Sequence, residues 1–190
     1  RSSDLSWTWP GFEGKKAEVE VYFKAYEVEL FLNGSSLGRQ KVKDCIAKFK
    51  TKYQPGTLKA VAYDNVGREL GTSELKTAGK ETLLTVTPEK TELKANGEDL
   101  AYINIDLTDA AGILKNMEDR KVTVTVTSPC TLQAMGSDNP WTEERYAGSS
   151  FTTYNGHALA IVRSGEEAGE CIVTVRVEGL ESKSLKLKIS

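Results

Sequence analysis

The sequence predicts an all-β protein made of two tandem antiparallel β-sandwich domains. Apolar and polar residues alternate along most of the 190 residues, and no window keeps apolar residues at helical spacing over three turns. Turn-forming pairs such as Asn33-Gly34 divide the chain into short runs. Successive side chains of a strand point to opposite faces, so this alternation is typical of strands with one buried face. Many short strands with regular turns favour a sandwich.

The first half of the chain contains five alternating runs. The clearest run places Val28, Leu30 and Leu32 on one face, and the Asn33-Gly34 pair that follows tolerates the positive φ angles of a tight hairpin turn. We therefore expect a hairpin at this point. Strands are expected over residues 17–24, 27–32, 46–53, 57–63 and 68–77.

A break in the pattern separates the two halves. Residues 77–81 are small or polar, and a new series of runs rich in β-branched residues begins at Thr82. We expect one domain over residues 1–79 and a second over residues 80–190. A long loop over residues 135–154 interrupts the second series, and loops of that length usually have a function. Strands are expected in this half over residues 82–86, 100–108, 121–127, 158–163, 171–177 and 184–189.

Composition excludes several classes of function. Apolar residues make up 39% and charged residues 27% of the chain, which is the balance of a soluble globular protein. The 25 basic and 27 acidic residues are scattered and leave a net charge of −2, so neither nucleic acid nor a membrane is expected as a partner. Residues 1–4 do not resemble the start of a signal peptide, so we expect the chain to begin inside a longer protein.

Cysteine and histidine usage predicts neither a metal site nor a cofactor. Cys45, Cys130 and Cys171 have no CxxC spacing and cannot all pair, so buried free thiols are the simplest interpretation. Cys130 and Cys171 fall in one expected domain and could meet across its sandwich, which leaves their pairing open. The single histidine, His157, has no sequence context typical of a hydrolytic triad and is interpreted as a turn or surface residue.

Six segments carry a resemblance to a known enzyme family. The runs WTWPGFEG at residues 7–14, VEVYF at residues 19–23 and EVELFLNGSSLGR at residues 27–39 resemble the domain that follows the barrel in β-galactosidase-like enzymes of glycoside hydrolase family 2. The runs TPEKTELKANGEDLA at 87–101, GSDNP at 136–140 and YNGHALAIVR at 154–163 resemble the immunoglobulin-like C-terminal domain of the same bacterial enzymes.

The resemblance implies a non-catalytic role in carbohydrate metabolism. In this family two glutamates on a (β/α)₈ barrel carry out retaining glycoside hydrolysis. These residues show no barrel-type alternation of strands and helices, so no catalytic residue is assigned. The adjacent pairs Glu143-Glu144 and Glu166-Glu167 diverge along the chain and are interpreted as solvated charges. The implied partner is the catalytic barrel of the same parent chain, and the family suggests a periplasmic or secreted location.

Four aromatic residues are the candidate contact residues. We interpret Trp7 and Trp9 as packing residues, either in their own core or against the barrel, with sugar stacking as the alternative. Trp141 either plugs the end of its own domain or, with Tyr146, contacts a glycan or another domain.

Two main functional hypotheses follow. The first is a structural, interdomain module of a family 2 enzyme. The second is a carbohydrate-binding module, in which Trp141 and Tyr146 line a shallow platform for glycan. Cell-surface adhesion is a third hypothesis that rests on fold alone.

Overall fold

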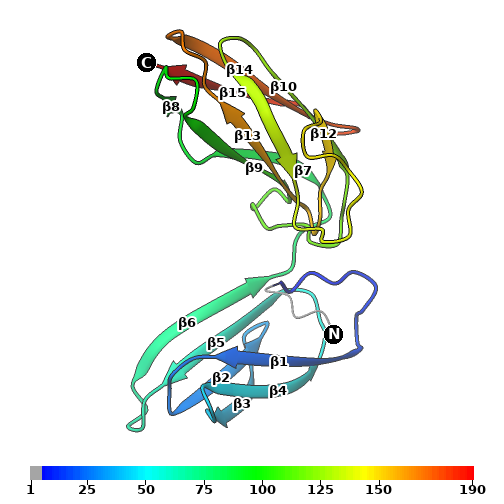
Figure 1. Cartoon of the computed structure of the whole chain (residues 1–190). Helices are drawn as coiled ribbons and strands as arrows, with labels where there is room; N and C mark the ends of the chain where they lie inside the picture. Colours follow the sequence, from blue (N-terminus) through cyan, green and yellow to red (C-terminus); the bar gives the residue numbers. More distant parts are fainter. Residues whose placement is uncertain (1–5) are drawn as a thin grey trace. The chain divides into compact units, whose positions relative to one another are not determined.

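The computed structural model describes residues 6–190, which form two compact units. The first unit ends at Thr77 and the second begins at Ala78. All regular elements in the described range are β-strands, which confirms the predicted all-β sandwich class (Figure 1). No helix among these residues could cross a membrane.

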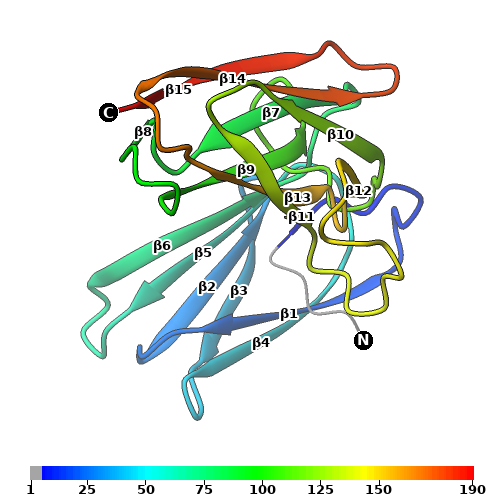
Figure 2. The same ribbon diagram turned by 45° about the horizontal axis from the view of Figure 1, so that its top comes forward.

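The first unit contains a two-stranded and a four-stranded sheet. The small sheet pairs β1 with β4, and the larger one has the order β3-β2-β5-β6 (Figure 2). All of these pairs are antiparallel. The strands are β1 (Lys16–Tyr22), β2 (Glu27–Leu32), β3 (Ser35–Lys41), β4 (Ile46–Lys52), β5 (Thr57–Tyr63) and β6 (Glu69–Lys76).

The hairpin between β2 and β3 forms where the sequence predicts it. Asn33 and Gly34 both have positive φ angles, of 51° and 80°, as the turn requires. Val28, Leu30 and Leu32 of β2 are buried, which confirms the predicted apolar face. They pack into the core of the first unit with Trp7 and Phe49, among others. The return strand β3 lies outside the strand ranges predicted from the sequence, because its residues do not alternate and all of them are exposed.

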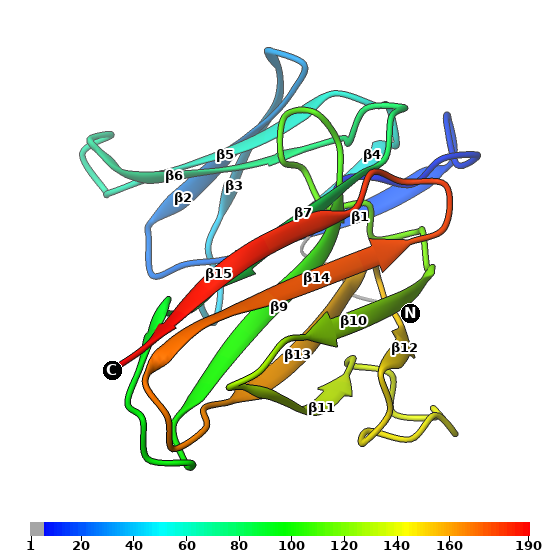
Figure 3. The same ribbon diagram turned by 90° about the horizontal axis from the view of Figure 1, so that it is seen from above.

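The second unit contains a five-stranded and a four-stranded sheet. The first has the order β12-β10-β14-β15-β8 and the second β11-β13-β9-β7; Figure 3 shows β10, β14 and β15 in one layer. One pair departs from the antiparallel expectation, since β8 runs parallel to β15. The strands are β7 (Leu83–Pro88), β8 (Glu92–Leu93), β9 (Leu100–Thr108), β10 (Lys121–Val126), β11 (Thr131–Gly136), β12 (Ser150–Thr152), β13 (His157–Arg163), β14 (Gly169–Val177) and β15 (Lys183–Ile189).

Alternation along the central strands forms the core of the second unit. Ile103 and Ile105 of β9 and Val173 and Val175 of β14 are completely buried, and they belong to the same apolar cluster. The short strands β8, β11 and β12 were not predicted. The register of β11 against β13 shifts between Leu132 and Ala134, which interrupts the alternation that would have revealed it.

The start of the second unit is held by hydrogen bonds from a loop after β9. The Asp109 carboxylate accepts bonds from the backbone N–H groups of Gly79 at 2.6 Å, Ile113 at 2.8 Å and Ala111 at 2.9 Å. These bonds, led by the one from Gly79, keep the pKa of Asp109 below its ordinary value. The Lys115 ammonium also donates to the Gly79 carbonyl at 2.7 Å.

Candidate functional site

The most exposed large aromatic side chain of the second unit lies on the loop between β11 and β12. This loop covers residues 137–149 and is shorter than the expected one, because β11 and β12 occupy its ends. Trp141 is 80% exposed. The expectation that Trp141 plugs the end of its own domain is therefore wrong, because a plug would be buried.

The 137–149 loop is anchored at several points despite its exposure. Asn139 Oδ1 accepts a hydrogen bond from the backbone N–H of Trp141 at 3.0 Å. The Glu144 carboxylate accepts bonds from the Thr152 N–H at 2.9 Å and the Thr152 hydroxyl at 3.1 Å. Glu144 therefore ties the loop to β12, whereas the sequence had suggested a solvated charge. The Trp141 side chain is therefore exposed to solvent on a loop whose backbone is held by these hydrogen bonds.

Tyr146 lies at the foot of the same loop and is partly committed to its own unit. Its carbonyl accepts a hydrogen bond from the Met135 N–H at 2.7 Å. Its ring stacks on Phe151, with centroids 5.4 Å apart and an interplanar angle of 21°. Tyr146 is nevertheless 56% exposed to solvent. Among the described residues, Trp141 and Tyr146 make no ring contact with each other.

Trp7 and Trp9 form an aromatic cluster with Tyr53 in the first unit. The ring centroids of Trp7 lie 5.2 Å from Trp9 and 5.1 Å from Tyr53. The indole N–H of Trp7 donates to the Gln54 carbonyl at 2.9 Å, and the Tyr53 hydroxyl accepts a bond from the Trp9 N–H at 3.1 Å. Trp7 is 1% exposed, so it packs in its own core and cannot stack on a sugar. Trp9 is half-buried.

A histidine–carboxylate pair joins β13 to β9 at the end of the sandwich from which the 137–149 loop departs. His157 Nδ1 lies 2.6 Å from the Asp106 carboxylate. This hydrogen bond raises the pKa of His157 above its ordinary value of 6.5; partial burial opposes it, and the charges of Asp106 and Asp138 add to it. Asp138 is part of the loop, so its charge is coupled to the pair.

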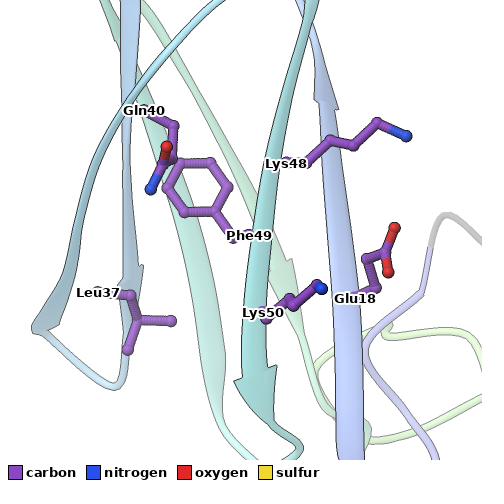
Figure 4. Close-up of a pocket in the computed structure, with 6 residues that line it drawn as sticks. All are labelled: Glu18, Leu37, Gln40, Lys48, Phe49 and Lys50. Carbon is purple, nitrogen blue, oxygen red and sulfur yellow. The ribbon is translucent and has the colours of Figure 1, made fainter.

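A cleft of about 500 Å³ opens in the first unit and was not anticipated from the sequence. In Figure 4, Leu37 and Gln40 of β3 and Phe49 of β4 gather between their strands, while Glu18 of β1 and Lys48 of β4 extend to the other side. Glu18 is the only carboxylate in this lining, whereas a glycosidase needs two carboxyl groups across the scissile bond. The lining of the cleft therefore contains no pair of carboxyl groups. The cleft was missed because two of its six lining residues, Leu37 and Gln40, lie on the unpredicted strand β3.

The described residues also lack a recognisable metal site. Residues 6–190 contain no group of three or more His, Cys, Asp or Glu side chains that could hold an ion.

Two family models match the chain. The one described as glycoside hydrolase family 2 C-terminal domain 5 matches residues 84–186, and one for a domain of unknown function, DUF4982, matches residues 14–71.

Solved structures and curated proteins similar to this chain were also found. A crystal structure of a glycosyl hydrolase family 2 member from Bacteroides cellulosilyticus is 37% identical, has a TM-score of 0.94, and aligns with 97% of this chain and 24% of its own. A β-galactosidase from Bacteroides ovatus is 29% identical over 95% of this chain and 21% of its own length. A putative β-glucuronidase from Formosa agariphila is 29% identical over 91% of this chain and 17% of its own length. The chain thus spans about a fifth of these curated relatives.

Proposed function

This chain belongs to the C-terminal domain family of glycoside hydrolase family 2. We therefore propose that its two sandwiches are a non-catalytic, interdomain part of a β-galactosidase-like enzyme. In this role they pack beside the catalytic barrel of the same polypeptide and present the 137–149 loop to it. The observation that carries the proposal is Trp141, which is 80% exposed on a loop that Glu144 ties to β12.

An exposed tryptophan on a fixed backbone is characteristic of a contact surface. Tryptophan dominates the energetics of interfaces when a partner buries it, and a loop that is already ordered loses little entropy on binding. Glu143 and Arg145, the sequence neighbours of the anchored Glu144, are also exposed on this loop, and polar residues of this kind are typical of the rim of an interface. These features support burial of Trp141 against another domain.

A carbohydrate-binding module is the second candidate. The exposure of Trp141 favours it, because an indole face can cover the apolar face of a sugar ring. The relatives are named as a β-galactosidase and a putative β-glucuronidase, so galactose and glucuronate are the sugars to test. A flat platform, however, would need Tyr146 beside Trp141, and the Tyr146 ring is stacked on Phe151 instead.

Titration of the chain with galactose- and glucuronate-containing oligosaccharides separates the two candidates. Tryptophan fluorescence and heat are followed in the native chain, in Trp141→Ala and in Tyr22→Ala, a matched control because Tyr22 is exposed on the first unit. The interdomain role predicts no saturable signal at millimolar ligand. Saturable binding that is lost only in Trp141→Ala would replace it with the carbohydrate-binding module.

The interdomain role also has a direct test in the full-length polypeptide that carries the barrel. There, Trp141→Ala lowers the temperature at which hydrolytic activity is lost, because the barrel loses an anchor, and Tyr22→Ala leaves that temperature unchanged. Equal behaviour of the two variants would contradict a contact between Trp141 and the barrel.

A further inference from the structure

Two cysteines meet across the core of the second unit. Cys130 directly precedes β11 in one sheet, and Cys171 lies on β14 in the opposite sheet. Their sulfur atoms are 2.7 Å apart. Cys130 is 4% exposed and Cys171 is completely buried, and both belong to the apolar cluster of this unit.

The backbone holds these two residues together independently of their sulfur atoms. The Thr127 N–H donates to the Ile172 carbonyl at 3.0 Å, and the Ile172 N–H donates to the Thr127 hydroxyl at 2.8 Å. The Cys130 N–H donates back to the Thr127 carbonyl at 3.2 Å. Since Ile172 is the neighbour of Cys171, these bonds fix the turn that carries Cys130 beside the strand that carries Cys171.

We propose that Cys130 and Cys171 form a structural disulfide that joins the two sheets of the second unit. A disulfide has a sulfur–sulfur distance of about 2.05 Å, so the sulfur atoms need to approach by only about 0.7 Å from their 2.7 Å separation. Small side-chain rotations on anchored backbones supply that movement. The third cysteine, Cys45, is exposed on the first unit and stays a thiol.

The oxidant is a small-molecule disulfide, for which oxidised glutathione is the probe. One cysteine thiolate attacks a glutathione sulfur and releases one glutathione thiolate, which leaves a mixed disulfide on the protein. The second cysteine thiolate attacks the protein sulfur of that mixed disulfide and releases the second glutathione. The two protons of the protein thiols end on the two glutathione thiols, so two cysteines are oxidised and one glutathione disulfide is reduced.

The reaction belongs to folding rather than to the folded protein. Burial, followed by the hydrogen bond with Cys130, raises the pKa of the Cys171 thiol well above its ordinary value, and the attacking species is the thiolate. A closed core therefore keeps reduced cysteines unreactive. Once formed, the bond is protected by the same core.

Oxidative refolding of the whole chain tests the proposal. The chain is unfolded in urea with reductant and refolded either with oxidised and reduced glutathione or with reduced glutathione alone. The first product is then denatured, its thiols are alkylated, and its peptides are mapped by mass spectrometry. We expect one alkylated cysteine, Cys45, and a cross-linked pair of peptides that contain Cys130 and Cys171. Alkylation of both Cys130 and Cys171 after oxidative refolding would overturn the proposal.

Thermal unfolding provides the second measurement. The bond joins residues that are 41 positions apart in the sequence, so the oxidised chain should unfold roughly 10 °C above the reduced one in the second-unit transition. Cys45→Ser should keep this difference, whereas Cys130→Ala and Cys171→Ala should abolish it. A difference that persists in either alanine variant contradicts the assignment. If an alanine variant does not fold, the peptide map of the native chain still decides, and neither measurement depends on a glycan or a barrel.

Discussion

At the scale of single residues, two tryptophans have opposite structural roles. Trp7 is surrounded by Trp9 and Tyr53, and its indole N–H is satisfied by the Gln54 carbonyl. Trp141 is held through its backbone, and its ring contributes little to any core. Substitution of Trp7 should therefore lower stability, whereas substitution of Trp141 should affect the recognition that we assign to it and leave stability nearly unchanged.

Urea unfolding of the two alanine variants tests this separation. Trp7→Ala should lower the free energy of unfolding of the first unit by about 3–5 kcal/mol, because it empties a packed aromatic site. Trp141→Ala should change that of the second unit by less than about 0.5 kcal/mol, because the side chain is already in solvent. Losses of similar size in both variants, measured by circular dichroism, would show that Trp141 packs in the free chain.

His157 makes the second unit sensitive to pH. Its pKa is raised in the folded state above the ordinary 6.5, chiefly by the hydrogen bond to Asp106, so the folded state binds the proton more tightly. The resulting stability is fully present below about pH 6.5 and is lost as pH rises through the folded pKa. The charged groups that act on the ring are Asp106 and Asp138.

Nuclear magnetic resonance titration of the single histidine measures this effect directly. In the native chain we expect the pKa of His157 above 6.5, and in Asp106→Asn we expect it to fall, because the negative charge that stabilises the protonated ring is removed. His157→Gln should remove the corresponding decrease of stability that occurs as pH rises above about 6.5. An unchanged histidine pKa in Asp106→Asn would refute this account.

At the scale of elements, the edge strand β3 is stabilised by its neighbour rather than by a core face. Arg39 donates to the carboxylates of Glu29 at 2.8 Å and Glu27 at 2.9 Å, and the Ser36 hydroxyl donates to Glu29 at 2.7 Å. Charged side chains on an exposed edge also discourage pairing with other chains. The β2–β3 turn therefore decides whether this edge forms, because β3 has no buried face of its own.

A pair of glycine substitutions tests the dependence on this turn. Gly34 has a φ angle of +80° with open space around its Cα, so Gly34→Ala should cost about 1–2 kcal/mol from backbone conformation alone. Gly71 of β6 lacks such an angle, and a Cβ there would meet only Phe23, at 3.9 Å. Gly71→Ala should be neutral to within about 0.5 kcal/mol in the same chemical unfolding measurement. Equal costs would mean that the turn conformation is not limiting.

At the scale of the whole molecule, each unit has its own apolar core. One cluster contains residues from Trp7 to Ala62, and the other contains residues from Leu84 to Ile189. The Gly79 N–H donates a hydrogen bond to the Asp109 carboxylate, so the chain is already attached to the second unit one residue after the boundary at Ala78. Separate cores imply that each unit can fold by itself.

Residues 78–190 should therefore form a stable domain in isolation. We expect this segment to show a single cooperative thermal transition by circular dichroism, and well-dispersed amide resonances, since its cluster includes no residue of the first unit. The whole chain, measured under the same conditions, should contain a transition at a similar temperature. An unfolded isolated segment would show that the first unit contributes stability that its separate core does not reveal.

Much of the fold could be predicted from local pattern. The strands with strong alternation, such as β2 and β9, appear where it occurs, because a buried face imposes a period of two on the residues of one strand. The resemblance to family 2 glycoside hydrolases is also confirmed, since its motifs are themselves stretches of sequence. The short or edge strands β3, β8, β11 and β12 were missed. They form by hydrogen bonding to neighbouring strands, and their own residues show no clear apolar alternation that would predict them.

By itself, the sequence determined the all-β class, the buried faces of the long strands and the family. Only the tertiary structure decided which aromatic residues are available, since Trp7 and Trp141 are the same residue type but one is buried and the other is exposed. Only the tertiary structure brought Cys130 beside Cys171, from 41 residues away. The physical reason is that alternation specifies which side of a strand is apolar, whereas the pairing of strands and sheets specifies what that side meets.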